Sequence, residues 1–497
     1  MNETTPLLAD VEDGRPSYVR ASEDRDVKSA VDINGSPDDP QQWPASFKWS
    51  IVALLSFSAF SVTYGCLSVA PVATRIANDL DGGNSGKSSA ALLVTIWELG
   101  EAAGPLLIAP LAEMFGRWPL YNAANVLFVV ATILGALSKD TGEFVASRAL
   151  TGMAVAANVL NPAIIGDIFP TEQRGAAMSY IMFAPLVASS VGPAFSSIIA
   201  GSLGWRSVLW TSVALAAVNG LVFFSCFRET YKVIILRRKV AKLRKAADDA
   251  SRIESLTKEI HLVKSPAGLW TSMMRPAVVF FGSGVLAALS LFGSLMYSYF
   301  YVISTTLPGI LEEVYLFPAS MTGSAFLANG IGTFIGVVIC NLSLDRIYVK
   351  LSNDNKGVGR PEFRLPLTLI GTATMPPAVA LYGWCAEYRL PLYLFLISVV
   401  WIRVSMTLAF LPLMPYVVDA CGIYSASALT GMIVIRCLAG AFLPLATAGM
   451  IEHLGYGRGF TTLAVVSLVA GLIPALVLRF GSRWRQRSKY TKTTQEA

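Results

Sequence analysis

The sequence predicts an all-α membrane protein with twelve transmembrane helices arranged as two halves of six. Hydrophobic residues make up 54% of the 497 residues, charged residues only 14%, and the mean hydropathy is +0.55. This composition leaves too little polar surface to cover a water-soluble globule, so lipid is expected to surround most of the chain. One long polar segment near the middle divides the apolar stretches six and six.

The individual spans are predicted from length and charge. A helix needs about 20 predominantly apolar residues to cross a hydrocarbon core, and twelve stretches meet this requirement. In the first half they are residues 49–71, 89–110, 118–137, 144–166, 176–200 and 207–226. In the second half they are residues 277–303, 319–340, 365–385, 392–416, 424–450 and 459–478. Nearly every face of these segments is apolar, so helical periodicity does not say which side of a span turns inward.

The polar segments complete the predicted domain organisation. Residues 1–48 are rich in Asp, Glu, Ser and Pro and lack the apolar core of a secretory signal, which indicates a disordered cytosolic tail. A central loop at 227–276 separates a six-helix bundle at 49–226 from a second bundle at 277–480. Residues 481–497 are predicted to form a cytosolic C-terminal tail.

The central loop is basic next to the sixth span. A run of Lys and Arg at 237–245 lies directly beside a membrane segment, so it is expected to meet anionic lipid headgroups rather than nucleic acid. Residues 240–260 combine helix-favouring residues with mixed charge, and both a short interfacial helix and a flexible tether fit them.

The distribution of Lys and Arg predicts the orientation. If both termini are cytosolic, the inside segments hold 30 of the 39 Lys and Arg residues and the outside loops hold six. Short loops rich in Lys and Arg stay in the cytosol, so cytosolic termini are favoured. The six on the outside are Arg75, Lys87, Lys139, Arg206, Arg389 and Arg458.

No pattern in the sequence indicates an enzyme, a cofactor or a metal site. A Walker phosphate loop is missing, so ATP hydrolysis is not expected to be the energy source. The six cysteines lie singly in or beside the spans, without the spacing of a disulfide framework or a metal site. The two histidines, His261 and His453, fall in loops, so a proton carrier within the spans is expected to be a carboxylate.

A series of short motifs follows the chain in a recognisable order. They are Gly104-Pro105, Ala109-Pro110-Leu111-Ala112-Glu113 with Gly116-Arg117, Arg148 with Gly152, Gly192-Pro193, Gly204-Trp205-Arg206, the stretch Arg360 to Pro366, and Asp419 with Tyr424 to Ala428. Over residues 43–480 their order and spacing resemble the major facilitator superfamily, and within it the twelve-span drug:proton antiporters common in fungi. The resemblance implies the major facilitator fold, with two pseudo-symmetric six-helix bundles that rock about a central site.

The resemblance also implies a conformational latch at the cytosolic turns that follow the second and eighth spans. The family residues carried over are Glu113, Gly116 and Arg117 after the second span, and Asp167 at the end of the fourth span is a second acid near Arg117. Asp345 and Arg346 occupy the matching turn of the second half, and Asp419, after the tenth span, completes the set. The chain departs from the family pattern, because Glu113 stands for Asp, Ala109 stands for the first Gly, and Met114 and Trp118 stand for basic residues. The latch is therefore expected to be weaker or differently tuned. An ordinary capped helix turn is the alternative.

Arg148 matches the family's arginine that is thought to assist proton transfer. An arginine within lipid is costly unless it is paired or hydrated, so it should point into its bundle. Its candidate partners are Glu98 and Glu101, which lie one turn apart on one face of the second span. A carboxylate near a guanidinium in a desolvated site suits proton coupling. A permanent structural ion pair is the alternative.

Arg403 and Arg436 are the other two arginines within spans, and no acid lies at comparable depth in the second half. Arginines without a neutralising acid that face a cavity favour an anionic or carboxylate-bearing substrate. Pairing with backbone or polar side chains is the alternative. Asn158, Asn161, Tyr297 and Tyr301 are predicted to line the same cavity.

Gly192 and Pro193 in the fifth span resemble the family's antiporter motif, in which a kinked, Gly-rich helix packs closely and limits leakage. The match is partial, because the family has glycine where this chain has Ser179, Ala188, Ser196 and Ser197, so close packing survives through small residues. The motif favours export over import.

These observations predict a proton-coupled antiporter that exports amphipathic small molecules, either as multidrug efflux or as transport of one secondary metabolite. An uptake symporter for a polyamine, sugar or carboxylate is the first alternative, and a non-transporting membrane sensor is the second. The expected partners are a small-molecule substrate, protons and the lipid bilayer, with no nucleic acid, and the protein is expected to be a monomer. The plasma membrane is the first choice of location and the vacuolar membrane the second.

Overall fold

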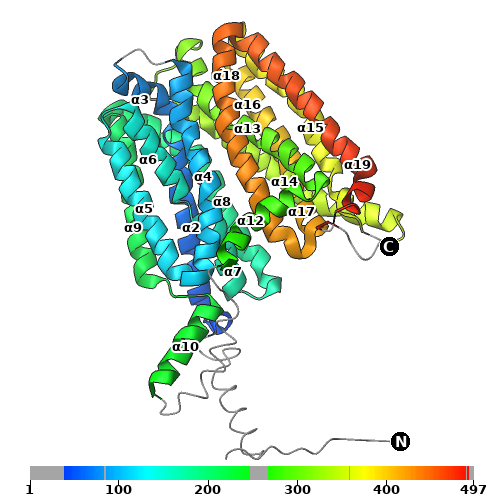
Figure 1. Cartoon of the computed structure of the whole chain (residues 1–497). Coiled ribbons are helices and arrows are strands. Elements are labelled where there is room, and N and C mark those ends of the chain that lie inside the picture. Colours follow the sequence, from blue (N-terminus) through cyan, green and yellow to red (C-terminus); the bar gives the residue numbers. More distant parts are fainter. Residues whose placement is uncertain (1–38, 83–85, 247–266, 358, 489, 492–497) are drawn as a thin grey trace, which may run out of the picture.

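The computed structural model describes residues 39–82, 86–246, 267–357, 359–488 and 490–491, and this part of the chain is folded into helices joined by turns (Figure 1). The first half contains α2 (Ala45–Leu67), α3 (Ala73–Leu80), α4 (Lys87–Phe115), α5 (Arg117–Leu137), α6 (Thr141–Met153), α7 (Ala157–Ile168), α8 (Thr171–Leu203) and α9 (Trp205–Cys226). The second half contains α12 (Ala267–Phe281), α13 (Gly284–Glu313), α14 (Phe326–Asp354), α15 (Pro366–Glu387), α16 (Leu392–Phe410), α17 (Leu413–Cys421), α18 (Ser425–Ala470) and α19 (Leu472–Arg485). Short 3-10 turns join them at Pro40–Gln42 (η1), Ala70–Val72 (η2), Thr322–Ala325 (η3), Pro361–Arg364 (η4) and Gly422–Tyr424 (η5).

The central loop contains one described helix, α10 (Lys232–Ala246). It begins before the 240–260 segment whose composition suits a helix, and residues 247–266 lie outside the described part of the chain. Helix α12 begins at Ala267, within the 227–276 segment predicted to form the central loop.

All twelve predicted spans fall on helices, although only nine helical segments of the described chain are long and apolar enough to cross a membrane by themselves. The fourth predicted span is divided into α6 and α7, each shorter than a bilayer crossing. The ninth is α15, 22 residues long and outside that group of nine. The last two spans run together in Ser425–Arg485, where Gly455 (φ 76°, ψ 177°) breaks the helix between them.

The two halves lie side by side and meet along two pairs of helices (Figure 1). Helix α4 of the first half packs along α18 of the second, and α8 packs along α14. We call the end of the molecule that carries the start of α2, α10 and the end of α19 the terminal face. The opposite end, with α3 and the start of α4, is the outer face, because the charge distribution predicts that it lies outside the cell.

Candidate functional site

Helices α4 and α6 approach closely at two glycines. A Cβ on Gly100 would overlap the carbonyl oxygen of Ala149, and a Cβ on Gly152 would overlap that of Trp97. Small residues at such positions allow helix backbones to come into contact within a membrane. The contact places the guanidinium of Arg148 over the ring of Trp97, 4.7 Å from its centroid.

Arg148 is buried and binds the end of α2. Its Nη1 donates to the carbonyl oxygen of Gly65 at 2.7 Å, and its Nη2 donates to that of Cys66 at 2.8 Å. The last carbonyls of a helix have no partner within the helix and carry its negative dipole end, so a cation is favoured there. The structure therefore differs from the expected pairing of Arg148 with Glu98 or Glu101.

Glu101 forms an ion pair across the two halves instead. The Nη2 atom of Arg436 in α18 donates to Oε1 of Glu101 in α4 at 2.9 Å, and both side chains are largely buried. Nε1 of Trp97 donates to the other carboxylate oxygen at 3.3 Å. The guanidinium of Arg436 also lies over the ring of Tyr297, at 4.5 Å from its centroid. Arg436 is thus neutralised by an acid from the opposite half, which corrects the expectation that it would lack one.

Glu98 lies one turn before Glu101 and is fully buried. Neither of its carboxylate oxygens meets a hydrogen-bond donor with acceptable geometry among the described residues. A carboxylate oxygen of each glutamate and the Sγ atom of Cys437 lie within 4.8 Å of one another. Opposite them, Gly440 leaves room for the acid, because a Cβ there would come within 3.2 Å of Glu98 Oε2. The adjacent Arg436 carries a positive charge, which disfavours a metal ion in this cluster.

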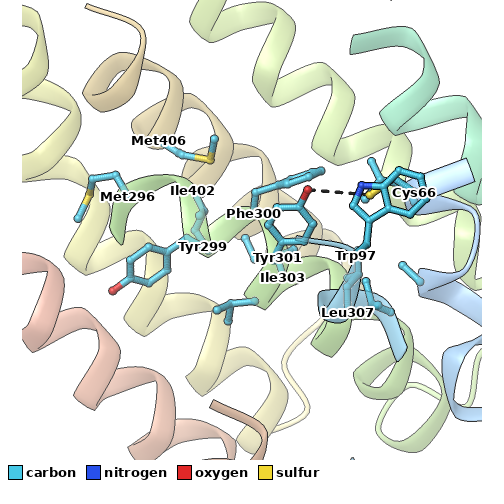
Figure 2. Close-up of a cluster of buried hydrophobic side chains, with 14 of the residues drawn as sticks. Cys66, Trp97, Met296, Tyr299, Phe300, Tyr301, Ile303, Leu307, Ile402 and Met406 are labelled. Carbon is cyan, nitrogen blue, oxygen red and sulfur yellow. Dashed lines mark hydrogen bonds between the residues drawn. The ribbon is translucent and has the colours of Figure 1, made fainter. Parts of the chain in front are cut away.

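Aromatic residues of α13 cover the cluster on one side. Figure 2 shows Tyr301 directed towards Cys66, with the hydroxyl 4.0 Å from Sγ and the indole of Trp97 beside them. Tyr301 and Phe300 are both buried within the core that joins the halves. The charged cluster is thus enclosed by apolar and aromatic side chains of the core that joins the halves.

Arg403 is held within the second half by α14. Its Nε and Nη2 donate to Oγ1 of Thr333 at 3.0 and 2.7 Å, and its guanidinium lies over the ring of Phe300, 4.5 Å from the centroid. These contacts match the alternative of pairing with a polar side chain. No acid of the described residues pairs with Arg403, but Thr333 and Phe300 hold its guanidinium.

The predicted cavity residues divide into two groups. Tyr297 and Tyr301 lie at the charged cluster, as their contacts with Arg436 and Cys66 place them. Asn161 lies away from it, because its Oδ1 accepts from Tyr121 at 3.0 Å and its Nδ2 donates to the carbonyl of Leu55 at 3.4 Å within the first half. The side chain of Asn158 lies outside the described part of the structure.

Part of the predicted latch of the first half, Arg117 with Asp167, forms an ion pair at the terminal face. Arg117 Nε lies 3.4 Å from Oδ2 of Asp167, and Gly116 adopts a φ of 104° at the turn between α4 and α5. Glu229, which the sequence did not single out, accepts the backbone N–H groups of Arg117 at 2.9 Å and Trp118 at 3.2 Å. An acid at the start of a helix is favoured by unpaired N–H groups there.

The second half has a similar network with a different base. Arg364 lies 3.5 Å from Oδ1 of Asp345 and also donates to Oδ2 of Asp419. The predicted base Arg346 is exposed instead. Arg364 lies in η4, where α14 and α17 meet it through Asp345 and Asp419. In the sequence, only its place in the motif Arg360 to Pro366 singled out this arginine.

Gly192 and Pro193 lie where α8 contacts other helices. A Cβ on Gly192 would come within 3.3 Å of the ring of Tyr64. The carbonyl oxygen of Pro193 faces Gly323 of the other half, and the N–H of Gly323 donates to Oγ of Ser197 at 2.9 Å. The small residues of the motif therefore permit close packing both within the first half and between the halves.

Comparison with known proteins agrees with this architecture. Residues 51–444 match the family model described as Major Facilitator Superfamily. The chain is 32% identical to "Efflux pump radE" of Floropilus chiversii over 94% of this chain and 87% of that protein. It is 33% identical to "MFS-type transporter atr4" of Stereocaulon alpinum, over 98% and 89% of the two chains. A D-xylose-proton symporter superposes with a TM-score of 0.65 at 16% identity, covering 86% of this chain and 97% of that one, and this likeness confirms the predicted fold class.

Proposed function

This chain belongs to the major facilitator superfamily and is a transporter rather than an enzyme, and we propose that it exports amphipathic small molecules by alternating access coupled to protons. The observation that carries the proposal is the charged cluster in which Glu98 and Glu101 of one half meet Arg436 of the other. The name efflux pump, given to a relative that covers most of this chain, supports export.

Glu98 is the proposed proton carrier. An ionised carboxylate that is buried without hydrogen bonds is costly, and that cost is relieved when water enters the site. Movement of the halves that lets water in or shuts it out at this cluster can therefore change whether Glu98 binds a proton. No other carboxylate of the described spans combines full burial with two oxygens that lack hydrogen-bond donors.

The ion pair between Glu101 and Arg436 is the proposed link between proton binding and movement of the halves. Removing one partner of a buried ion pair leaves the other charge uncompensated and is strongly destabilising. Separation of α4 from α18 would leave both Glu101 and Arg436 with uncompensated charges, unless a proton or a substrate took the place of the lost partner. The pair thus ties the conformation of the transporter to whether a proton or a substrate is bound at the cluster.

The charge of the substrate decides the sign of this coupling. A basic or hydrogen-bond-donating group would occupy the same carboxylate as the proton, so substrate and proton would compete, and such competition produces exchange. An acidic group would instead draw Arg436 away from Glu101, and the released carboxylate would bind a proton together with the substrate. Export by proton exchange therefore favours a substrate with a basic or donor group.

The second candidate function, proton-coupled uptake of a carboxylate, follows from the same reasoning with Arg436 as the anion-binding group. Uptake of a polyamine or a sugar, and a non-transporting sensor role, have no comparable support in the site. We place the protein in the plasma membrane, with the vacuolar membrane second, both termini in the cytosol and the chain acting as a monomer.

The proposal is tested by measuring retention of labelled amphipathic cations and labelled organic acids in cells with and without the protein. Lower retention of a cation that a protonophore restores to the control value is the expected result. Lower retention that the protonophore leaves unchanged would contradict proton coupling, and higher retention would establish an importer.

A variant separates the proton carrier from the rest of the site. Glu98→Gln should abolish gradient-driven export but keep exchange of labelled for unlabelled substrate, because exchange needs no net proton movement. The matched control is Glu143→Gln, which alters an exposed carboxylate at the start of α6 and should leave both activities unchanged. Gradient-driven export by Glu98→Gln at the normal rate would assign the proton to another group.

A further inference from the structure

A charged contact joins the two halves at the outer face. Lys87, the first residue of α4, places its Nζ 2.7 Å from Oε2 of Glu313 at the end of α13 and 3.0 Å from the hydroxyl of Tyr456. That hydroxyl in turn donates to Oε2 of Glu313 at 3.0 Å, so the three groups form a closed triangle. The backbone N–H of Lys87 also donates to Oε1 of Glu452 at 3.1 Å.

The contact borders a cavity between the halves. The cavity has a volume of about 330 Å³ and is lined from both sides, by Asn78 and Ala91 of the first half and by Thr305 and Thr306 of the second. Lys87, Glu313, Glu452 and Tyr456 line it as well. Ala91 precedes Glu98 by two helical turns on α4, and Thr305 follows Tyr301 by one turn on α13. The cavity therefore lies between the buried acids and the outer face.

Other groups at this face reinforce the same closure. Arg75 of α3 lies close enough to Glu312 of α13 to interact electrostatically across the halves. The N–H of Gly323 in η3 of the second half donates to Oγ of Ser197 in α8 of the first half. Closure at this face thus combines a backbone contact at one side with charges at the other.

We propose that Lys87 is the outer gating residue of the transporter: its contacts with Glu313, Tyr456 and Glu452 hold the two halves together beside the cavity, and they must break for a substrate to leave through it. All three partners belong to the second half, whereas Lys87 belongs to the first, so a rigid movement of one half against the other separates them together. This gate determines whether the outer face is open. Its action does not depend on proton coupling or on the chemistry of the substrate.

The chain provides a matched control for this gate. Arg206 and Asp79 form an ion pair of 3.0 Å at the same face, with side chains 46% and 52% exposed, against 43% and 51% for Lys87 and Glu313. Both members of the control pair belong to the first half. Arg206→Gln therefore removes an ion pair of equal exposure that does not cross between the halves.

The test measures the distance between spin labels at the outer ends of the two halves. Leu203→Cys on α8 and Tyr388→Cys after α15 are exposed positions, and Cys226→Ser removes the exposed native cysteine. Lys87→Met should raise the ratio of the long-distance to the short-distance population by about two- to fivefold, the range expected for one partly exposed ion pair. Lys87→Arg and Arg206→Gln should leave the ratio at the wild-type value.

A double variant separates gating from a general loss of stability. If Lys87 acts through Glu313, then Glu313→Gln should reproduce the shift, and Lys87→Met with Glu313→Gln should shift the ratio no further than either alone. An unchanged ratio in Lys87→Met, or an equal shift in Arg206→Gln, would overturn the proposal. Failure of proton-coupled export in the cell assay would leave this distance result unaffected.

Discussion

The outer face and the terminal face hold their charges in different ways. At the outer face, Lys87 reaches across to Glu313 and Tyr456 of the other half. At the terminal face, the charged contacts of the predicted latch stay inside a half, as between Arg117 and Asp167. A contact inside a half survives when the halves move as rigid bodies, whereas a contact across them must break. The outer face, like the buried pair of Glu101 and Arg436, therefore carries contacts that report on conformation in this structure.

The predicted latch has a different role in this conformation, because its charged contacts lie within each half. In this conformation the contacts of Arg117 and Arg364 stiffen the ends of their own halves. Their action as a latch between the halves stays a prediction for another state of the transport cycle. Substitutions at Gly323, Glu229, Arg364 and Arg206 test the contrast, with effects that are expected to decrease in that order.

The largest effect is expected at the backbone contact of the outer face. Gly323→Ala adds a Cβ that would overlap the carbonyl oxygen of Pro193 and the hydroxyl of Ser197. Overpacking costs about 1–3 kcal/mol, which corresponds to at least about a fivefold loss of the state closed at this face. The spin-label distance between positions 203 and 388 should increase, and transport should fall in parallel. Gly449→Ala, which meets open space, should change neither quantity.

Glu229→Gln is expected to lower stability strongly. It should not change the spin-label distance between positions 203 and 388 at the outer face. The Glu229 carboxylate is buried and accepts four backbone N–H groups, from Arg117, Trp118, Thr230 and Tyr231. Hydrogen bonds to charged groups contribute about 1.5–3 kcal/mol, so stability should fall by about 2 kcal/mol. Thermal unfolding in detergent would measure it. An increase of the outer distance as large as in Lys87→Met would contradict the contrast between the faces.

A smaller effect is expected from Arg364→Gln. The side chain of Arg364 is 17% exposed, and its partner Asp419 is 31% exposed, so loss of their contact should cost about 1 kcal/mol. The unfolding midpoint should fall by about 1 °C. Arg346→Gln is the control, because the sequence assigns that arginine to the latch but the structure exposes it. A larger loss in Arg346→Gln than in Arg364→Gln would favour the sequence-based assignment.

The smallest effect is expected from Arg206→Gln. This exposed pair with Asp79 lies within one half, and such pairs contribute about 0–1 kcal/mol. Both transport and the outer distance should remain at the wild-type values, and any loss of stability should shrink further in high salt. A change in transport would show that the first half itself deforms during the cycle.

The sequence by itself determined that the chain lies in lipid, where its spans are and which family it belongs to. Long stretches with few charges must be helical in lipid, because a helix satisfies its own backbone hydrogen bonds there. For that reason all twelve predicted segments fall on helices, even where α6 and α7 divide one of them. The ordered motifs then identified the superfamily, since turns and close contacts require particular residues at fixed positions.

Only the tertiary structure decided which charges meet. Glu101 and Arg436 are 335 residues apart, and the helices that carry them are apolar on nearly every face, so no periodic pattern indicated which side of each turns towards the other. The sequence offered Arg148 as the partner, but the carbonyls at the end of α2 occupy that arginine. Ion pairing depends on helix rotation and on contact between the halves, and both are set by packing over the whole molecule.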